Sequence, residues 1–485
     1  MNAPVPSGKI AGVLLLATAL LVAASCLRGA EYDEQYTLFL TGGTARPVWP
    51  SSVISAQEVL ALQEGRARFG AIARDLRATD VHPPLYFWIV AMWRQLFGDS
   101  LFAARLLSVL CGVTALGIVA IIARQTSVPV ATAMLLTLGS YGFVYTDVIA
   151  RGFALAQLLN LAGITLLLPA RRCPRKAFCA GLLLSAATFT NYLAAFVGCA
   201  GLLWALLASR RSWPWVTLGF IALLPADVWF LVAQHGSRIA QFEPFILASS
   251  AARLTRYTAA AVFGGLPLYV PGIWSHVVAA AIAAFVLMVL LFALLRWRRI
   301  HPLIALAAIA PPAGLLLLGL AFNNTPIELR YLAFATPFIG LILASVLPRR
   351  LVYAVLAIQS LSLIGLMTRT ETMQPAGATA LAAASLVRNG IVLVPHGNDG
   401  VGIVGAFARE APPTLRLLVI RRDDTPAQIL ARTGNAARVV LAMLGQDADS
   451  RATLPHMRAA FDNPCWRTVG QGSNVLAFER ICGEE

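Results

Sequence analysis

Charged residues are scarce in this sequence. Only 13% of its 485 residues are charged and 58% are hydrophobic, and the mean hydropathy is +0.73. Soluble domains carry about 25% charged residues, so this composition excludes an ordinary soluble protein. Long apolar runs separated by short polar segments are typical of chains that cross a membrane several times. We therefore expect a polytopic α-helical membrane protein.

Lysine is almost absent, and so are the motifs of nucleotide and metal chemistry. Lys9 and Lys176 are the only lysines, so the net charge of +15 is almost entirely due to arginine. The arginines are spread between apolar runs, which argues against nucleic-acid binding and indicates a topology signal. No glycine-rich phosphate loop, zinc motif or nucleophile elbow occurs in the sequence. We predict no metal ligand, although a divalent cation stays open as a cofactor.

The seven cysteines fall into two groups. Five lie in or beside apolar runs without the spacing of metal ligands, and we expect them to be small buried hydrophobic residues. Cys465 and Cys482 lie in a polar C-terminal region, where a disulfide is expected if the region is outside the cytosol. The first group comprises Cys26, Cys111, Cys173, Cys179 and Cys199.

Eleven apolar runs have the length of a membrane span or nearly so. The first imitates a signal peptide, but we expect an uncleaved span that anchors the acidic segment after it. A further run, 83–97, begins with two prolines and carries Arg94, so we predict an amphipathic helix lying in the interface. The eleven runs cover residues 8–28, 101–123, 128–146, 152–170, 177–190, 192–208, 213–233, 273–295, 302–322, 331–347 and 351–367.

The distribution of the arginines predicts the orientation of these spans. With eleven crossings and a cytosolic N-terminus, most basic residues between spans face the cytosol, and a twelfth crossing would put most of them outside. The predicted outer short connections hold Arg28, Arg151, Arg330 and Arg369. The predicted cytosolic set is Lys9, Arg124, Arg171, Arg172, Arg175, Lys176, Arg210, Arg211, Arg296, Arg298, Arg299, Arg349 and Arg350.

This topology predicts two domains. A membrane domain covers residues 1–367 with a large outer loop at 29–100, and a small extracytoplasmic α/β domain covers 368–485. In the loop, Ser55-Ala56-Gln57-Glu58 predicts a capping box that opens a helix running to about Phe69. In the tail, four apolar runs predict strands at 391–394, 415–420, 438–443 and 474–479.

Asp33 and Glu34, directly after the first span, are the strongest candidates for a site. Carboxylates gain nothing at the edge of a bilayer unless they meet water, a cation or a reacting group. On an extended segment the two would point in opposite directions, so that one faces a cleft as a general base. The alternative is a pair of solvated loop carboxylates. Glu31, in the same run, is the weakest candidate.

A histidine and three arginines are predicted on the same face. Pro83 and Pro84 fix the backbone beside His82, although a helix start with an incidental histidine is the alternative. Arginine near the outer face opposes the usual charge bias, and its guanidinium matches a phosphate bidentately. These arginines are Arg105, Arg151 and Arg330; Asp147, four residues before Arg151, offers the alternative of an intramolecular ion pair.

Together these motifs resemble the GT-C glycosyltransferases of the protein O-mannosyltransferase and aminoarabinose-transferase superfamily. The resemblance extends over residues 30–335 and implies the GT-C fold. It also implies transfer of a sugar from a polyprenyl-phosphate donor at the outer membrane face. The motifs that carry it are Asp33-Glu34, His82-Pro83-Pro84-Leu85-Tyr86, Gly98, Arg105-Leu106-Leu107-Ser108, Ala150-Arg151-Gly152-Phe153-Ala154-Leu155 and Arg330-Tyr331-Leu332.

The resemblance assigns roles to residues. It implies that Asp33 is the base that activates the acceptor, with Glu34 supporting it, and that His82 lies in the wall of the site. It gives the three arginines contacts to the donor phosphate or support of the cavity, and we add Asp147 and Tyr331 to the predicted substrate-binding set. Phe153 stands where the family often has tyrosine, and Val148-Ile149 where it is more polar, so the sugar stays undetermined.

The predicted function is an inverting transfer to a lipopolysaccharide, another envelope glycan or a protein, at the periplasmic face of a bacterial inner membrane. A lipid-linked-sugar flippase or other transporter is the main alternative. Transporters usually carry ionisable groups near the middle of the bilayer, whereas the acids and arginines here collect at its outer boundary. An inactive membrane scaffold with a binding tail is a third alternative.

Overall fold

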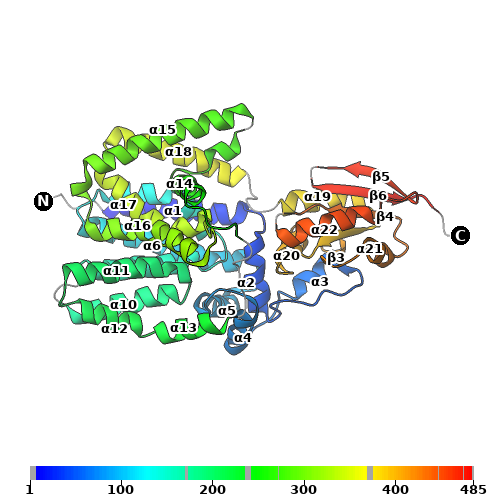
Figure 1. The fold of residues 1–485 in the computed structure, drawn as a ribbon, viewed down its shortest axis with the longest axis horizontal. Helices are drawn as coiled ribbons and strands as arrows, with labels where there is room; N and C mark the ends of the chain where they lie inside the picture. Colours follow the sequence, from blue (N-terminus) through cyan, green and yellow to red (C-terminus); the bar gives the residue numbers. More distant parts are fainter. Residues whose placement is uncertain are drawn as a thin grey trace. The chain divides into compact units, whose positions relative to one another are not determined.

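The computed structural model in Figure 1 describes residues 7–169, 173–234, 242–270, 272–368, 375–445, 447–472 and 474–482. The chain divides into two compact units. The helical unit comprises Met1–Cys26, Leu76–Tyr86 and Ala104–Arg369. The sheet unit comprises Leu27–Asp75, Phe87–Ala103 and Thr370–Glu485.

The helical unit consists mainly of long apolar helices (Figure 1). Short 3-10 segments, η2 (Tyr192–Ala194) and η6 (Leu329–Ala335), lead into two of them. The helices are α1 (Ser7–Leu27), α6 (Leu101–Gln125), α7 (Val130–Leu138), α8 (Tyr141–Asp147), α9 (Phe153–Leu167), α10 (Pro174–Thr188), α11 (Ala195–Ala208), α12 (Trp213–Ile221), α13 (Leu224–Ala233), α14 (Leu247–Phe263), α15 (Ile273–Leu295), α16 (Pro302–Phe322), α17 (Thr336–Val346) and α18 (Arg349–Thr368).

All eleven predicted spans fall on helices, but the helices differ in length. Among the described residues, six are long and apolar enough to cross a membrane, and α12 with α13, bent by 41°, makes a seventh. The other four predicted spans are shorter or interrupted: α7 ends before α8 begins, α9 and α10 have 15 residues each, and η2 with α11 covers Tyr192–Ala208. For these four, a full crossing stays a prediction. Arg171, Arg172 and Arg369 lie outside the described residues.

Two glycines let α10 and α12 approach closely. A Cβ atom at Gly181 would collide with the carbonyl oxygen of Val216, and one at Gly219 with that of Phe178. Small residues at such contacts allow helix backbones to pack directly in membrane proteins. This pair of glycines therefore determines the spacing between the two helices.

The sheet unit contains a six-stranded sheet in the order β1-β3-β2-β4-β6-β5. Strands β2, β3 and β4 are parallel, and the other pairings are antiparallel. The four predicted strands are confirmed, whereas β1 and β5 were missed because one is very short and the other is polar. The strands are β1 (Ile54–Ser55), β2 (Ile391–Pro395), β3 (Arg416–Ile420), β4 (Arg438–Ala442), β5 (Trp466–Gln471) and β6 (Val475–Arg480).

Helices pack on both faces of this sheet (Figure 1). On one face, α19 (Ala376–Val387) packs with α20 (Gly402–Glu410). On the other, α21 (Pro426–Thr433) packs with α22 (Ala448–Ala459), and their core residues Ile429 and Met457 join the apolar side chains of the strands. The predicted α/β character of the tail is therefore confirmed.

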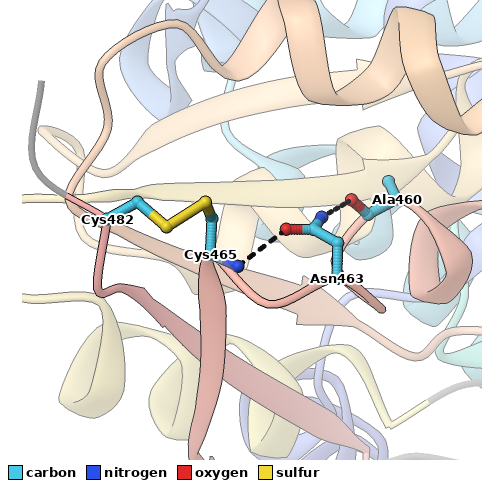
Figure 2. The surroundings of a disulfide bond; sticks show 4 residues. All are labelled: Ala460, Asn463, Cys465 and Cys482. Carbon is cyan, nitrogen blue, oxygen red and sulfur yellow. Dashed lines mark hydrogen bonds between the residues drawn. A yellow bond between two sulfur atoms is a disulfide. The ribbon is translucent and has the colours of Figure 1, made fainter. Parts of the chain in front are cut away.

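A disulfide joins Cys465, just before β5, to Cys482, just after β6 (Figure 2). The Asn463 side chain beside it accepts a hydrogen bond from the Cys465 N–H at 3.1 Å and donates one to the Ala460 carbonyl at 3.2 Å. The predicted pairing is thus present. Of the five cysteines expected to be buried, only Cys111 is fully so; Cys173 is half-buried, and the others are exposed on helix surfaces.

The first outer loop packs largely with the C-terminal residues. It forms α2 (Tyr32–Gly42), β1, α3 (Ala56–Ala61), α4 (Phe69–Thr79) and α5 (Leu85–Phe97). Strand β1 pairs with β3, and α2 and α3 contact α20. This grouping differs from the predicted membrane domain over 1–367, which included the whole loop. Helix α5 is present where the amphipathic helix was predicted, and its interfacial location stays a prediction.

The predicted capping box is confirmed, but the helix after it is shorter than predicted. The Glu58 carboxylate accepts the Ser55 N–H at 2.6 Å, and the Ser55 hydroxyl accepts the Glu58 N–H at 3.2 Å. The helix ends at Ala61 instead of near Phe69. Gly65 follows with a positive φ of 141°, a conformation that no residue inside a helix adopts.

A buried arginine ties the loop together. Arg94 on α5 donates through Nη1 to the Leu38 carbonyl at 3.1 Å and to the Thr41 hydroxyl at 2.6 Å. Through Nη2 it donates to the carbonyls of Gln63 at 2.7 Å and of Asp99 at 3.2 Å. One side chain thereby joins α2, α5 and the segment that follows α3.

Candidate active site

The acidic run of the sheet unit begins α2. Asp33 and Glu34 lie in the first helical turn, so the prediction of an extended segment is wrong. Glu31 and Glu34 form a capping box, in which the Glu34 carboxylate accepts the Glu31 N–H at 3.1 Å. Carboxylates stabilise a helix N-terminus by satisfying its N–H groups and its positive dipole. The helix start is the physical reason why the acids cluster here.

The three acids consequently have different surroundings. Glu31 pairs with Arg28 through a buried ion pair, which agrees with its place as the weakest catalytic candidate. Glu34 is fully buried and belongs to the cap. Asp33 takes no part in the capping box and is 7% exposed. Asp33 is therefore the acid of the pair that a substrate could reach more readily.

In the helical unit, His82 and Arg151 lie together. The Nε2 atom of His82 is 3.2 Å from Nη2 of Arg151, and its Nδ1 atom is 3.0 Å from a carboxylate oxygen of Asp80. The Gln234 side chain donates to the His82 carbonyl at 2.9 Å and accepts from the Tyr192 hydroxyl at 3.4 Å. His82 precedes α5, Arg151 follows α8, Tyr192 begins η2 and Gln234 follows α13. These four segments meet at one polar cluster.

The turn that carries Arg151 is held against α6. The Ser108 hydroxyl donates to the Ile149 carbonyl at 2.7 Å. Arg105, one turn earlier on α6 and only 2% exposed, donates to the Ser25 carbonyl at 2.8 Å. Arg105 therefore joins α6 to α1, which fits the structural support that the resemblance offered as one of its roles.

Asp147 does not form the ion pair that its spacing from Arg151 suggested. It is fully buried, and among the described residues neither of its carboxylate oxygens has a hydrogen-bond partner. It faces Gly112 on α6, where a Cβ atom would lie 2.6 Å from the carboxylate. The ion-pair alternative is wrong because Arg151 is directed to His82 instead.

Arg330 and Tyr331 lie on η6. Arg330 forms an ion pair with Glu328 at 2.6 Å, and its guanidinium lies over the Tyr331 ring. The Tyr331 ring also stacks with Phe153, at 6.4 Å between ring centroids. Phe153 begins α9 two residues after Arg151, so η6 packs against the start of the helix that follows the Arg151 turn. The Arg330 charge is balanced by Glu328.

Comparison with known proteins shows which enzymes this chain is similar to. Residues 81–231 match the family model described as dolichyl-phosphate-mannose-protein mannosyltransferase. Crystal structures of ArnT from Cupriavidus metallidurans share the fold: the form bound to undecaprenyl phosphate matches with a TM-score of 0.53 and 13% identity, over 98% of each chain. The apo form gives the same TM-score and identity over 97% of this chain and 98% of that chain. The chain therefore has the fold of the GT-C glycosyltransferases. No curated protein sequence matches it.

The likeness to ArnT confirms the predicted fold class. The family match over residues 81–231 supports the predicted enzyme class and favours a glycosyltransferase over the transporter and the scaffold. At 13% identity the likeness to ArnT shows the fold alone. The matched segment begins at Val81 and contains His82, Arg105, Asp147 and Arg151.

The sequence analysis missed three residues of the polar cluster around His82. Asp80 lies two residues before His82, and this short spacing was the one signal in the sequence that could have indicated their contact. Tyr192 and Gln234 lie far from His82 in the sequence, so only the packing of the helices brings them to it. Among the described residues, no three His, Cys, Asp or Glu side chains lie close enough together to hold a metal ion.

Proposed function

We propose that this protein is a glycosyltransferase that transfers a sugar from a polyprenyl-phosphate-linked donor to an envelope glycan, lipid or protein at the outer face of the membrane. The pairing of His82 with Arg151 carries the proposal. A guanidinium group suits a phosphate, because its planar fork of donors matches the phosphate oxygens. The similar ArnT structure holds undecaprenyl phosphate, which supports a polyprenyl-phosphate donor.

The proposed mechanism is a single displacement. Asp33 accepts the proton of the acceptor nucleophile, the nucleophile attacks the anomeric carbon, and the bond from that carbon to the phosphate oxygen breaks. Polyprenyl phosphate leaves with the bonding electron pair, and Arg151 stabilises the charge that develops on it. A single displacement inverts the anomeric centre. Glu34 contributes by holding the helix start from which Asp33 projects.

The proposed location is the periplasmic face of a bacterial inner membrane. Disulfides persist in oxidising compartments, so the bond between Cys465 and Cys482 supports an extracytoplasmic sheet unit. The distribution of arginines between the predicted spans supports the same orientation. A divalent cation is also a candidate cofactor. Transfer that is unchanged by a chelator would rule out that role.

The proposal is tested on lipid extracts and envelope glycans from cells that lack the gene and carry either the wild-type protein or a variant. With Asp33→Asn we expect a polyprenyl-phosphate-linked sugar to accumulate and one sugar to disappear from an envelope component, as in the empty deletion strain. Glu34→Gln is the matched control, because glutamine also completes a capping box, and it should restore most of the transfer. Mass spectra that are identical with and without the gene would contradict the proposed function.

A further inference from the structure

Asp80 is fixed by two interactions of its carboxylate. One oxygen accepts the backbone N–H of Val81 at 2.8 Å, and the other lies 3.0 Å from Nδ1 of His82. The residue is only 5% exposed. Its carboxylate is therefore aimed at the imidazole by its own backbone turn.

The other side of the imidazole determines where its proton lies. A guanidinium group has only donors, so the 3.2 Å contact between Nη2 of Arg151 and Nε2 of His82 requires Nε2 to accept. The single proton of a neutral ring then sits on Nδ1, where it faces Asp80. In the opposite tautomer an N–H of His82 would point at an N–H of Arg151.

The ring has little freedom to move away from this arrangement. Pro83 and Pro84 restrict the backbone after His82. The His82 carbonyl accepts a hydrogen bond from Gln234 at 2.9 Å, and the Leu85 N–H donates to the Phe189 carbonyl at 3.3 Å. The backbone thus places the imidazole, and the Asp80 carboxylate selects which nitrogen carries the proton.

We propose that Asp80 is a positioning residue that fixes the Nδ1–H tautomer of His82 and thereby orients Arg151 toward the donor phosphate. The inference rests on the proposed function for the identity of that phosphate. The Asp80 carboxylate also offsets the Arg151 charge through the imidazole. In metal sites and in catalytic triads, a carboxylate fixes the tautomer of a histidine in the same way. The Tyr192 hydroxyl lies within electrostatic reach of Asp80 and Asp227 and, through Gln234, adjoins the His82 backbone.

Asp80→Asn separates this role from a local structural one. Asparagine keeps an oxygen that can accept the Val81 N–H, so the turn survives. Its amide group would donate to Nδ1, which favours the proton on Nε2 and sets His82 against Arg151. His82→Gln supplies the complementary variant, because a glutamine oxygen can accept from Arg151 where Nε2 stands and has no ring proton to place.

The experiment compares four purified proteins: wild type, Asp80→Asn, His82→Gln and the double variant. In the wild-type background we expect Asp80→Asn to lower kcat/KM for the lipid-linked donor about 10- to 100-fold, mainly by raising KM. In the His82→Gln background the same change should alter kcat/KM by less than about threefold, because no tautomer is left to fix. Equal losses in both backgrounds, or no loss in either, would overturn the inference. Asp75→Asn, on α4 and more exposed than Asp80, is the matched control and should leave the activity unchanged.

A second measurement does not depend on activity. In protein labelled with ¹⁵N in its histidine rings, the His82 signals are those lost in His82→Gln. We expect a proton-bearing Nδ1 in the wild type and its loss from Nδ1 in Asp80→Asn. A wild-type protein without transferase activity but with this tautomer would contradict the proposed function and leave the positioning of His82 intact. A proton on Nε2 in the wild type would overturn the inference itself.

Discussion

Arg94 shows how much one buried side chain decides in the first outer loop. Its guanidinium group donates four hydrogen bonds to groups on three different segments, and it is only 4% exposed. A planar fork of donors can serve carbonyl oxygens on both sides at once, whereas a lysine ammonium is a point charge with three donors. Arg94 therefore holds together the segments of the loop that carries Asp33.

We predict that Arg94→Lys lowers the free energy of unfolding of the sheet unit by about 2–4 kcal/mol, because at least two buried carbonyls lose a charged donor. Thermal unfolding in detergent should show a lower Tm. Arg74→Lys is the control, since the Arg74 side chain is 71% exposed and makes only a 3.8 Å ion pair with Asp75. Equal Tm values for the two variants would refute the role assigned to Arg94.

At the residue scale, the sequence predicts which residues belong to the polar cluster better than it predicts which residues they contact. It singled out His82 and Arg151, whose Nε2 and Nη2 atoms lie 3.2 Å apart in the structure. It also offered Asp147 as the partner of Arg151. A spacing of four residues predicts an ion pair only within a continuous helix. Here α8 ends at Asp147, before Arg151 is reached, so the two side chains leave the chain in unrelated directions.

At the scale of elements, the contact between α10 and α12 depends on the absence of side chains. We predict that Gly181→Ala and Gly219→Ala each destabilise the helical unit by about 1–3 kcal/mol, because the added methyl group collides with a backbone carbonyl that cannot rotate away. Gly117→Ala on α6, where nothing lies within 4 Å of the new Cβ atom, should be neutral or slightly stabilising. Thermal unfolding of the three purified variants in detergent is the measurement. A Gly181 variant as stable as the Gly117 variant would show that the helices can move apart without cost.

The hydrophobic runs predicted well which segments are helical, but they predicted poorly where the helices end. Every predicted span is helical, because long apolar segments have few alternatives in a membrane. The breaks inside those runs, at Gly139 and between α12 and α13, depend on packing that hydropathy does not record. In the tail, β5 was missed because its exposed edge position leaves it without an apolar pattern.

At the scale of the whole molecule, the sheet unit assembles from distant parts of the chain. Ile54 and Ser55 of the first loop pair with Leu417 and Arg416 at one edge of the C-terminal sheet. Two residues carry no recognisable strand pattern, and no local signal relates them to a strand near the other end of the sequence. The domain boundary at 367 was therefore predicted from the membrane topology alone. In the structure, most of the first loop packs into one compact unit with the C-terminal tail.

The central claim is that Asp33 is the base of a transfer from a polyprenyl-phosphate sugar. The most direct test is the rate of transfer by purified wild-type and Asp33→Asn proteins in lipid nanodiscs. The donor and acceptor are those identified by mass spectrometry of the deletion strain. We predict that Asp33→Asn lowers kcat by at least about 100-fold while Tm and donor binding stay within error of the wild type. A folded Asp33→Asn protein that transfers sugar at the wild-type rate would contradict the account.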